Sequence, residues 1–174
     1  WIKNGGVVFA QKRAAKWLAD NEILSASFIS HNQISQLFSA EALRYKDKEA
    51  LAARKRIAGA IFKATLDTSH PLAYGIESYN LPLFRNSTLI MKRQNQPFTS
   101  VVNYTDSPLI SGFADKNLVN IIAHNPALIA HNLGKGRIIA SSDNLTFRGY
   151  WLGSAKLLAN SLYFSKAFNT PIKE

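Results

Sequence analysis

Residues 127–168 read ALIAHNLGKGRIIASSDNLTFRGYWLGSAKLLANSLYFSKAF, in which three patterns follow one another. Two apolar, partly β-branched runs, 127–133 and 136–141, are separated by Gly134-Lys135. This spacing predicts a two-residue β-hairpin, because glycine can adopt the positive φ that such turns need. A polar loop over 143–149 comes next and leads into a helical pattern. We therefore expect strand, tight turn, strand, loop and covering helix, as at the closing edge of a layered α/β domain.

The helix expected after this loop carries a broad apolar stripe. Its residues are Trp151, Ala155, Leu158 and Leu162 at helical spacing, widened by Leu157, Phe164 and Phe168. A stripe as broad and aromatic as this is expected to pack against the flat face of a sheet.

Length and composition indicate one folded domain over residues 1–174. Hydrophobic residues make up 47% of the chain and charged residues 18%, which is typical of a globular protein. No apolar run approaches the roughly 18 to 20 residues of a membrane span. Cysteine is absent, which excludes disulfides, thiolate metal sites and a cysteine nucleophile. Because Trp1 already lies inside an expected element, we interpret the chain as a fragment of a longer polypeptide.

The net charge of +10 raises the question of an anionic partner. The cations are scattered over 12–16, 44–56 and 92–93, and acidic residues are mixed into the second group. No helix-turn-helix, aromatic-basic strand pattern or basic tail accompanies them. A solvated basic surface facing an acidic neighbour is the preferred interpretation, and a basic nucleic-acid-binding module is the alternative.

The N-terminal residues predict a strand that passes directly into a helix. Gly5-Gly6 ends a helical turn, residues 7–10 form a continuous apolar run, and residues 11–20 show helical spacing. The residues expected to face inward are Ala14, Ala15, Trp17 and Leu18. This pattern is typical of a buried parallel strand feeding a crossover, so we expect further strands before it in the complete sheet.

The middle of the chain predicts several short elements. Strands are expected over 59–67, 81–84, 88–92 and 100–104, and turns at 106–108 and at Gly112. Helices are expected over 33–38, 40–56 and 116–123; Ser39 would cap the second, with Leu43, Leu51 and Ile57 inward and its charges on a solvated face.

The histidines do not predict a metal site. Zinc peptidases need a carboxylate or a second histidine at helical or turn spacing. The residues three positions after His31, His70, His124 and His131 are Ile34, Ala73, Ala127 and Gly134. We therefore expect structural histidines, no metal ligand and no cofactor in this chain.

The turn between the first strand and the first helix is where α/β enzymes expose a nucleophile. Here it reads Ala10-Gln11-Lys12-Arg13 and contains neither serine nor cysteine. We interpret it as a degenerate nucleophile elbow in which Gln11 or Lys12 could point into a crevice. The simpler interpretation is a solvent-exposed first helical turn.

The loop over 143–149 is the other candidate binding site, because open α/β sheets bind ligands at strand ends. Asp143 could pair with Arg148, or Arg148 could hold a carboxylate or phosphate. Asn144 or Thr146 would cap the next helix. An enzyme site built from Asp143, Arg148 and Arg85 is one alternative, and a small-ligand site at the strand ends is another. The preferred interpretation is that these residues fix the loop to the helix.

A series of motifs in a fixed order resembles a known family. The motifs are WIKNGG at 1–6, AAKWL at 14–18, GAIF at 59–62, LD at 66–67, HPLAYG at 70–75, LFRNS at 83–87, PLISG at 108–112, GKGR at 134–137, DN at 143–144 and FRG at 147–149. This series resembles the C-terminal region of large bacterial zinc carboxypeptidases of the carboxypeptidase A type, in which a glutamine-amidotransferase-like domain follows the peptidase domain.

The resemblance implies a flavodoxin-like, class I glutamine-amidotransferase-like α/β fold. Its three-layer sheet would be mostly parallel, with an antiparallel hairpin at one edge and without its first strands. The family's zinc ligands belong to the peptidase domain, and no position here matches them. The cysteine expected near Gln11 and the late histidine are also missing from their places.

The resemblance therefore predicts a non-catalytic accessory domain of a secreted or periplasmic zinc metallocarboxypeptidase. Its partner would be the upstream peptidase domain, which would hold the zinc and cleave the peptide substrate.

Overall fold

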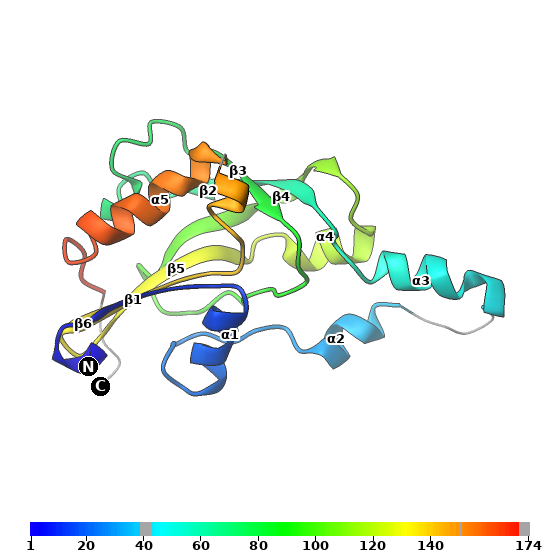
Figure 1. The fold of residues 1–174 in the computed structure, drawn as a ribbon, viewed down its shortest axis with the longest axis horizontal. Helices are drawn as coiled ribbons and strands as arrows, with labels where there is room; N and C mark the ends of the chain where they lie inside the picture. The colour runs from blue at the N-terminus through cyan, green and yellow to red at the C-terminus, as the bar shows by residue number, and fades with distance from the viewer. Residues whose placement is uncertain (39–42, 150, 171–174) are drawn as a thin grey trace.

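A computed structural model describes residues 1–38, 43–149 and 151–170 (Figure 1). One mixed sheet has six strands in the order β1-β6-β5-β4-β2-β3. The strands are β1 (Val7–Gln11), β2 (Ala60–Leu66), β3 (Asn80–Arg85), β4 (Ser100–Gly112), β5 (Pro126–Leu133) and β6 (Gly136–Ser141). The α-helices are α1 (Arg13–Asp20), α2 (His31–Gln36), α3 (Lys48–Arg54), α4 (Lys116–Ile122) and α5 (Leu152–Tyr163). The 3₁₀ turns are η1 (Ile2–Asn4), η2 (Tyr45–Asp47), η3 (Pro71–Ala73) and η4 (Phe147–Gly149). The chain is therefore an α/β protein.

The most deeply buried strand is β6, in which every residue is buried. Because neighbouring side chains of a strand point to opposite faces, Ile139 enters a large core and Ile138 a smaller one. Leu157 of α5 belongs to the large core and Leu18 of α1 to the small one. The two helices thus cover the sheet on opposite sides of β6 (Figure 1).

The sheet corrects the expectation of a mostly parallel arrangement. Only β1 and β6 are parallel, and the other four pairings are antiparallel. The reason is that parallel neighbours need a long crossover, whereas β2, β3 and β4 are joined without an α-helix. The β5–β6 hairpin lies inside the sheet, flanked by β4 and β1, and not at its edge. The first strand, β1, is itself an edge strand of this sheet and is only partly buried.

The hairpin prediction is confirmed. Leu133 pairs with Gly136 across the turn, and Gly134 has a φ of 59°. The strand-to-helix passage from β1 to α1 is also confirmed, as are β2, β3 and the helix over 116–122. These elements follow from local turn chemistry and short-range periodicity.

The inward face of α5 differs from the predicted stripe. The helix buries Ser154, Leu157, Asn160 and Ser161, whereas Leu162 is 72% exposed. The reason is polar: the Asn160 side-chain amide donates to the backbone carbonyls of Leu72 and Tyr74, at 2.7 and 2.9 Å. The helix therefore turns an asparagine inward to satisfy the carbonyl groups of η3.

Trp17 was also expected to face inward but is 58% exposed, and Ala14 is exposed beside it. The α1 helix buries Ala15 and Leu18, and both belong to the small core.

Two predictions in the middle of the chain are wrong. Residues 88–92 form no strand and contribute only an isolated bridge between Met91 and Phe28. The turn expected at 106–108 lies inside β4, where the register shifts between the Ala64–Tyr104 and Phe62–Leu109 pairs. The turn-forming residues are thus accommodated as an irregular bulge within one long strand.

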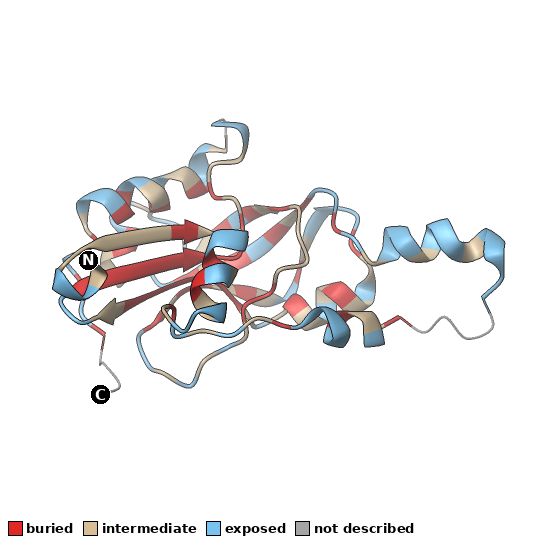
Figure 2. Ribbon diagram, turned by 60° about the horizontal axis from the view of Figure 1, so that its bottom comes forward, coloured by how far each residue is buried: buried red, intermediate tan, exposed pale blue. Residues whose placement is uncertain are grey.

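The helix expected over 40–56 is shorter among the described residues. It begins at Lys48 as α3, follows η2, and buries none of its residues (Figure 2), which agrees with the predicted solvated face. Ile57 is buried as expected, but Leu43 is 44% exposed. The Ser39 cap lies outside the described residues. No helix within the described ranges is long and apolar enough to cross a membrane.

Candidate functional site

The chain turns sharply between β1 and α1. The strand ends at Gln11, the helix begins at Arg13, and Lys12 makes the turn with φ 53° and ψ −116°. A residue with a Cβ rarely adopts such a conformation, which costs on the order of 1–3 kcal/mol and persists only where the surroundings hold it. We call residues 10–13 the elbow. The side chain that this turn presents is that of Lys12.

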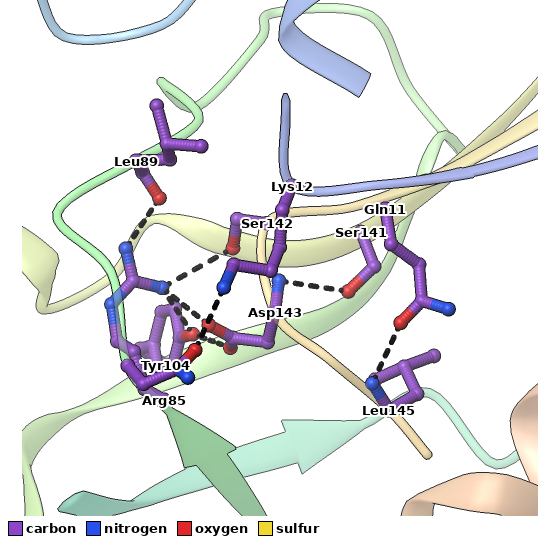
Figure 3. Close-up of polar contacts among 10 residues, drawn as sticks. Gln11, Lys12, Arg85, Leu89, Tyr104, Ser141, Ser142, Asp143 and Leu145 are labelled. Atoms are coloured by element: carbon purple, nitrogen blue, oxygen red, sulfur yellow. Dashed lines mark hydrogen bonds and ion pairs between the residues drawn. The ribbon is translucent and has the colours of Figure 1, made fainter. Parts of the chain in front are cut away.

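Three hydrogen bonds join Gln11 and Lys12 to distant segments, and Figure 3 shows the two that involve side chains. The Lys12 backbone N–H donates to the carbonyl of Ser141 at 2.8 Å. The Gln11 side-chain carbonyl accepts from the Leu145 backbone N–H at 2.8 Å. The Lys12 ammonium donates to the Asn86 side-chain carbonyl, also at 2.8 Å. The elbow is therefore joined to the segment after β6 and to the segment after β3.

A cleft of about 570 Å³ lies beside the elbow. Its lining residues are Gln11, Lys12, Arg13, Asn86, Ser87, Thr88 and Leu89. We call it the elbow cleft. Two lining residues are cations and none is a carboxylate, whereas three other cavities each include Asp67 or Asp106. The elbow cleft is thus positively charged.

A buried polar cluster around Arg85 lies next to the elbow. The Arg85 side chain is fully buried and donates to Asp143 at 2.8 Å, to the Tyr104 hydroxyl at 2.7 Å and to the Ser142 hydroxyl at 3.3 Å. It also donates to the Leu89 carbonyl, and the Tyr104 hydroxyl donates to the second carboxylate oxygen of Asp143. We call Arg85, Tyr104, Ser142 and Asp143 the Arg85 cluster.

The electrostatics of the Arg85 cluster follow from its burial. Burial alone lowers the pKa of the Arg85 guanidinium, but Tyr104 and Asp143 outweigh it and raise that pKa, so Arg85 keeps its proton. Burial raises the pKa of Tyr104 far above its ordinary value, so the phenol stays a donor. Burial likewise raises the pKa of the Asp143 carboxyl, opposed by Arg85 and by the nearby Lys12. The cluster therefore joins β3, β4 and the end of β6 by charge-assisted hydrogen bonds.

The predicted site residues do not all converge. Asp143 pairs with Arg85 and not with Arg148, which corrects the first of the two roles expected for Arg148. Arg148 is exposed and lies over the Phe147 ring, 5.2 Å from its centre. Asn144 accepts from the Thr146 N–H at 3.1 Å, a bond within the loop. Arg85 and Asp143 are packed inside the protein, so together with Arg148 they do not form an open catalytic site.

Sequence reasoning missed Tyr104, Ser142 and Asn86 as partners of the predicted residues. The pairing of Arg85 with Asp143 spans 58 positions, and the one with Tyr104 spans 19. No local pattern encodes such a pairing. The available signal was weak: an arginine at the end of a predicted strand.

Two histidines have structural contacts. The ring of His131 accepts from the Ser25 backbone N–H at 3.1 Å, and its other nitrogen contacts the Asn132 carbonyl at 2.8 Å. Burial lowers the pKa of His131, and it also lowers that of His70, whose ring accepts from the Leu72 N–H. Within the described part of the chain, no three histidine, aspartate or glutamate side chains gather as a metal site would require.

The largest cavity described, of about 670 Å³, lies along β2 and β4. Its charged lining residues are Lys63, Arg93, Asp106 and His124, so cations face an aspartate. His124 and Asp106 approach to 3.4 Å but both are exposed. Because Asp106 offsets one of its cations, this cavity has less net positive charge than the elbow cleft and is the weaker candidate.

No family model matches this chain, and no curated protein is detectably similar to it. The resemblance to carboxypeptidase-associated domains therefore stays a prediction that neither comparison supports or contradicts.

Proposed function

We propose that this chain is a non-catalytic accessory domain of a zinc metallocarboxypeptidase, built on an amidotransferase-like scaffold whose elbow has lost its nucleophile. The observation that carries the proposal is Lys12. It occupies a strained strand-to-helix turn, the kind of position at which α/β hydrolytic enzymes hold serine or cysteine. Strain that is retained without the reactive group supports descent from a catalytic scaffold.

The chemistry of Lys12 supports a binding role in preference to a covalent one. A lysine nucleophile must be deprotonated, which requires an apolar pocket or a neighbouring cation. Lys12 instead donates to Asn86 and lies close enough to Asp143 to affect its pKa. A lysine that donates to an amide carbonyl in this way is placed as a hydrogen-bond donor and not as a nucleophile.

The proposed place of this domain in the parent protein follows from the resemblance. The peptidase domain would hold the zinc ion, cleave C-terminal residues from peptides and contact this domain. The same proposal includes secretion of the parent protein or its export to the periplasm. The amidotransferase-like relationship extends here only to the β1, elbow and α1 unit, because the rest of the sheet is largely antiparallel.

The test combines three measurements on the purified chain. We expect less than stoichiometric zinc by metal analysis, no release of C-terminal residues from peptides and no hydrolysis of glutamine. One tightly bound zinc per chain, or turnover that Lys12→Met abolishes, would overturn the non-catalytic assignment. The parent assignment is tested separately on the full-length gene product, which should contain a His-x-x-Glu pair and a later histidine before Trp1.

A further inference from the structure

We infer that the elbow cleft binds a small anion, a carboxylate or a phosphate, through Lys12, Arg13 and the segment after β3. This inference goes beyond the proposed accessory role, because it names a ligand class and the residues that would hold it. It does not depend on the identity of the parent protein.

The first support is the charge around the cleft. Among the described residues, Lys12 and Arg13 line it and no acidic residue does. The nearest carboxylate that the structure relates to Lys12 is Asp143, which is fully buried and already paired with Arg85. Arg85 and Lys12 therefore share one carboxylate, and Arg13 adds a further positive charge on the cleft side.

The second support is the supply of free donors. Arg13 is exposed and has no hydrogen-bond or ion-pair partner in the part of the chain that the structure describes. The Lys12 ammonium donates once, to Asn86, and can donate two further hydrogen bonds. Both side chains can therefore bind an anion without breaking a contact that the fold requires.

The third support is Ser87, which lines the cleft on the opposite segment. Its hydroxyl oxygen is buried and has no hydrogen-bond partner within the described residues. A buried hydroxyl without a partner is destabilising, so a ligand oxygen that accepts from it would bind with the free energy of that additional hydrogen bond. Because Ser87 lies on the segment after β3, this hydroxyl is a donor that does not depend on the conformation of the elbow.

The start of α1 adds to these donors. The helix begins at Arg13, no side chain caps it, and no acidic residue lies in its first turn. Its first backbone N–H groups have no intrahelical acceptor, and they favour negative charge. An anion in the cleft would serve as the missing cap.

The size of the cleft favours a small ligand. A volume of about 570 Å³ falls within the roughly 300–1,000 Å³ of small-molecule sites. Sodium phosphate and glutarate are suitable probes, and glutaramide is the neutral counterpart of glutarate. Phosphate binding without glutarate binding would identify a phosphate site, and the converse a carboxylate site.

The experiment is an amide NMR titration of the complete chain at constant ionic strength. We expect saturable shifts at Arg13, Ala14 and Ser87 with phosphate or glutarate, and none with glutaramide. The double variant Lys12→Gln with Arg13→Gln should weaken binding by about tenfold or more, as expected for the loss of charge-assisted hydrogen bonds. Lys16→Gln is the control for the single variant Arg13→Gln, because each removes one positive charge and the two residues lie one turn apart on α1.

The single variant Arg13→Gln keeps the test valid if the double variant does not fold, because Arg13 is exposed. It should weaken binding several-fold while leaving the spectrum of the core unchanged. Absence of saturable shifts with both anions would overturn the inference, and so would equal weakening by Lys16→Gln. Catalytic turnover would contradict the proposed function but would leave this binding result unaffected.

Discussion

Arg85 is a guanidinium with no exposed surface, and its contacts explain how the protein tolerates it. Asp143, Tyr104, Ser142 and the Leu89 carbonyl all accept from it. Removing one partner of a buried ion pair leaves the other charge without compensation, whereas replacing both is often much less harmful.

We therefore expect Arg85→Met to lower the free energy of unfolding by about 3–5 kcal/mol, because Asp143 stays buried without its cation. The double variant Arg85→Met with Asp143→Leu should recover a large part of this loss. Urea unfolding, monitored by circular dichroism, measures the free energy of unfolding of the single and the double variant. The control is Arg54→Met, which breaks the half-exposed Arg54–Asp115 pair and should cost about 1 kcal/mol or less. Equal losses for Arg85→Met and Arg54→Met would contradict the importance of burial.

The elbow offers a second comparison at the level of one residue. Lys12→Ala and Lys12→Gly both lose the hydrogen bond to Asn86, but only glycine adopts φ 53° with ψ −116° without steric cost. The glycine variant should therefore be more stable than the alanine variant by about 1–3 kcal/mol. Thermal and urea unfolding of the two variants measure this difference in stability. If the two variants have the same free energy of unfolding, the turn is not strained, and the argument for a retained catalytic scaffold loses its basis.

Among the elements, those with local signals were predictable from the sequence and those with distant partners were not. Gly134-Lys135 contains the turn chemistry of the β5–β6 hairpin, so its register follows from two residues. The face of α5 depends on Asn160 reaching carbonyls of η3 more than 80 positions away. The order of the strands depends on which neighbours β1 and β4 pair with, and hydrophobic periodicity does not encode that pairing.

Some features of the candidate site were likewise predictable from local sequence patterns, and others were not. The sequence located the elbow, because an apolar strand followed directly by a helix is a local pattern. It also selected Arg85 and Asp143 as polar residues near strand ends. Their pairing brings together the end of β3 and the segment after β6, which are not neighbours in the sheet, so it could not be deduced. The elbow cleft was not predictable, since Ser87 and Lys12 approach only in the folded sheet.

The close packing of η1 against β6 leads to a prediction about a glycine. A Cβ at Gly136 would overlap the backbone carbonyls of Ile2 and Gly6, whereas one at Gly153 in α5 would meet no atom within 4 Å. We expect Gly136→Ala to lower the free energy of unfolding by about 1–3 kcal/mol or more, because the new Cβ would clash with backbone atoms that cannot move freely. The same substitution at Gly153 should stabilise by roughly 0.5–1 kcal/mol, from helix propensity alone. Chemical denaturation of both variants tests the contrast, and a neutral Gly136→Ala would show that η1 is not held against β6.

At the scale of the whole molecule, the cations behind the net charge of +10 are spread over separate elements of the described residues. Lys12, Arg13 and Lys16 belong to the elbow and α1, while the cations over 44–56 belong to η2 and α3. Figure 1 shows α3 at the opposite end of the molecule from β1 and β6, where the N-terminus lies. A linear nucleic acid would have to neutralise cations on separate elements, so few phosphates would be contacted at once.

Duplex and single-stranded DNA should therefore bind only weakly and only at low salt. Affinity for DNA depends on the number of phosphates that are neutralised, and the logarithm of the binding constant falls by about 0.9 per phosphate for each tenfold rise in salt. With two or three contacts, we expect a shallow slope and a dissociation constant weaker than about 10⁻⁴ M at roughly 150 mM salt. Fluorescence anisotropy with labelled oligonucleotides over a salt series measures both quantities, with Lys12→Gln/Arg13→Gln as the comparison. A steep slope and micromolar binding at physiological salt would favour the nucleic-acid-binding alternative over an accessory domain that binds small anions.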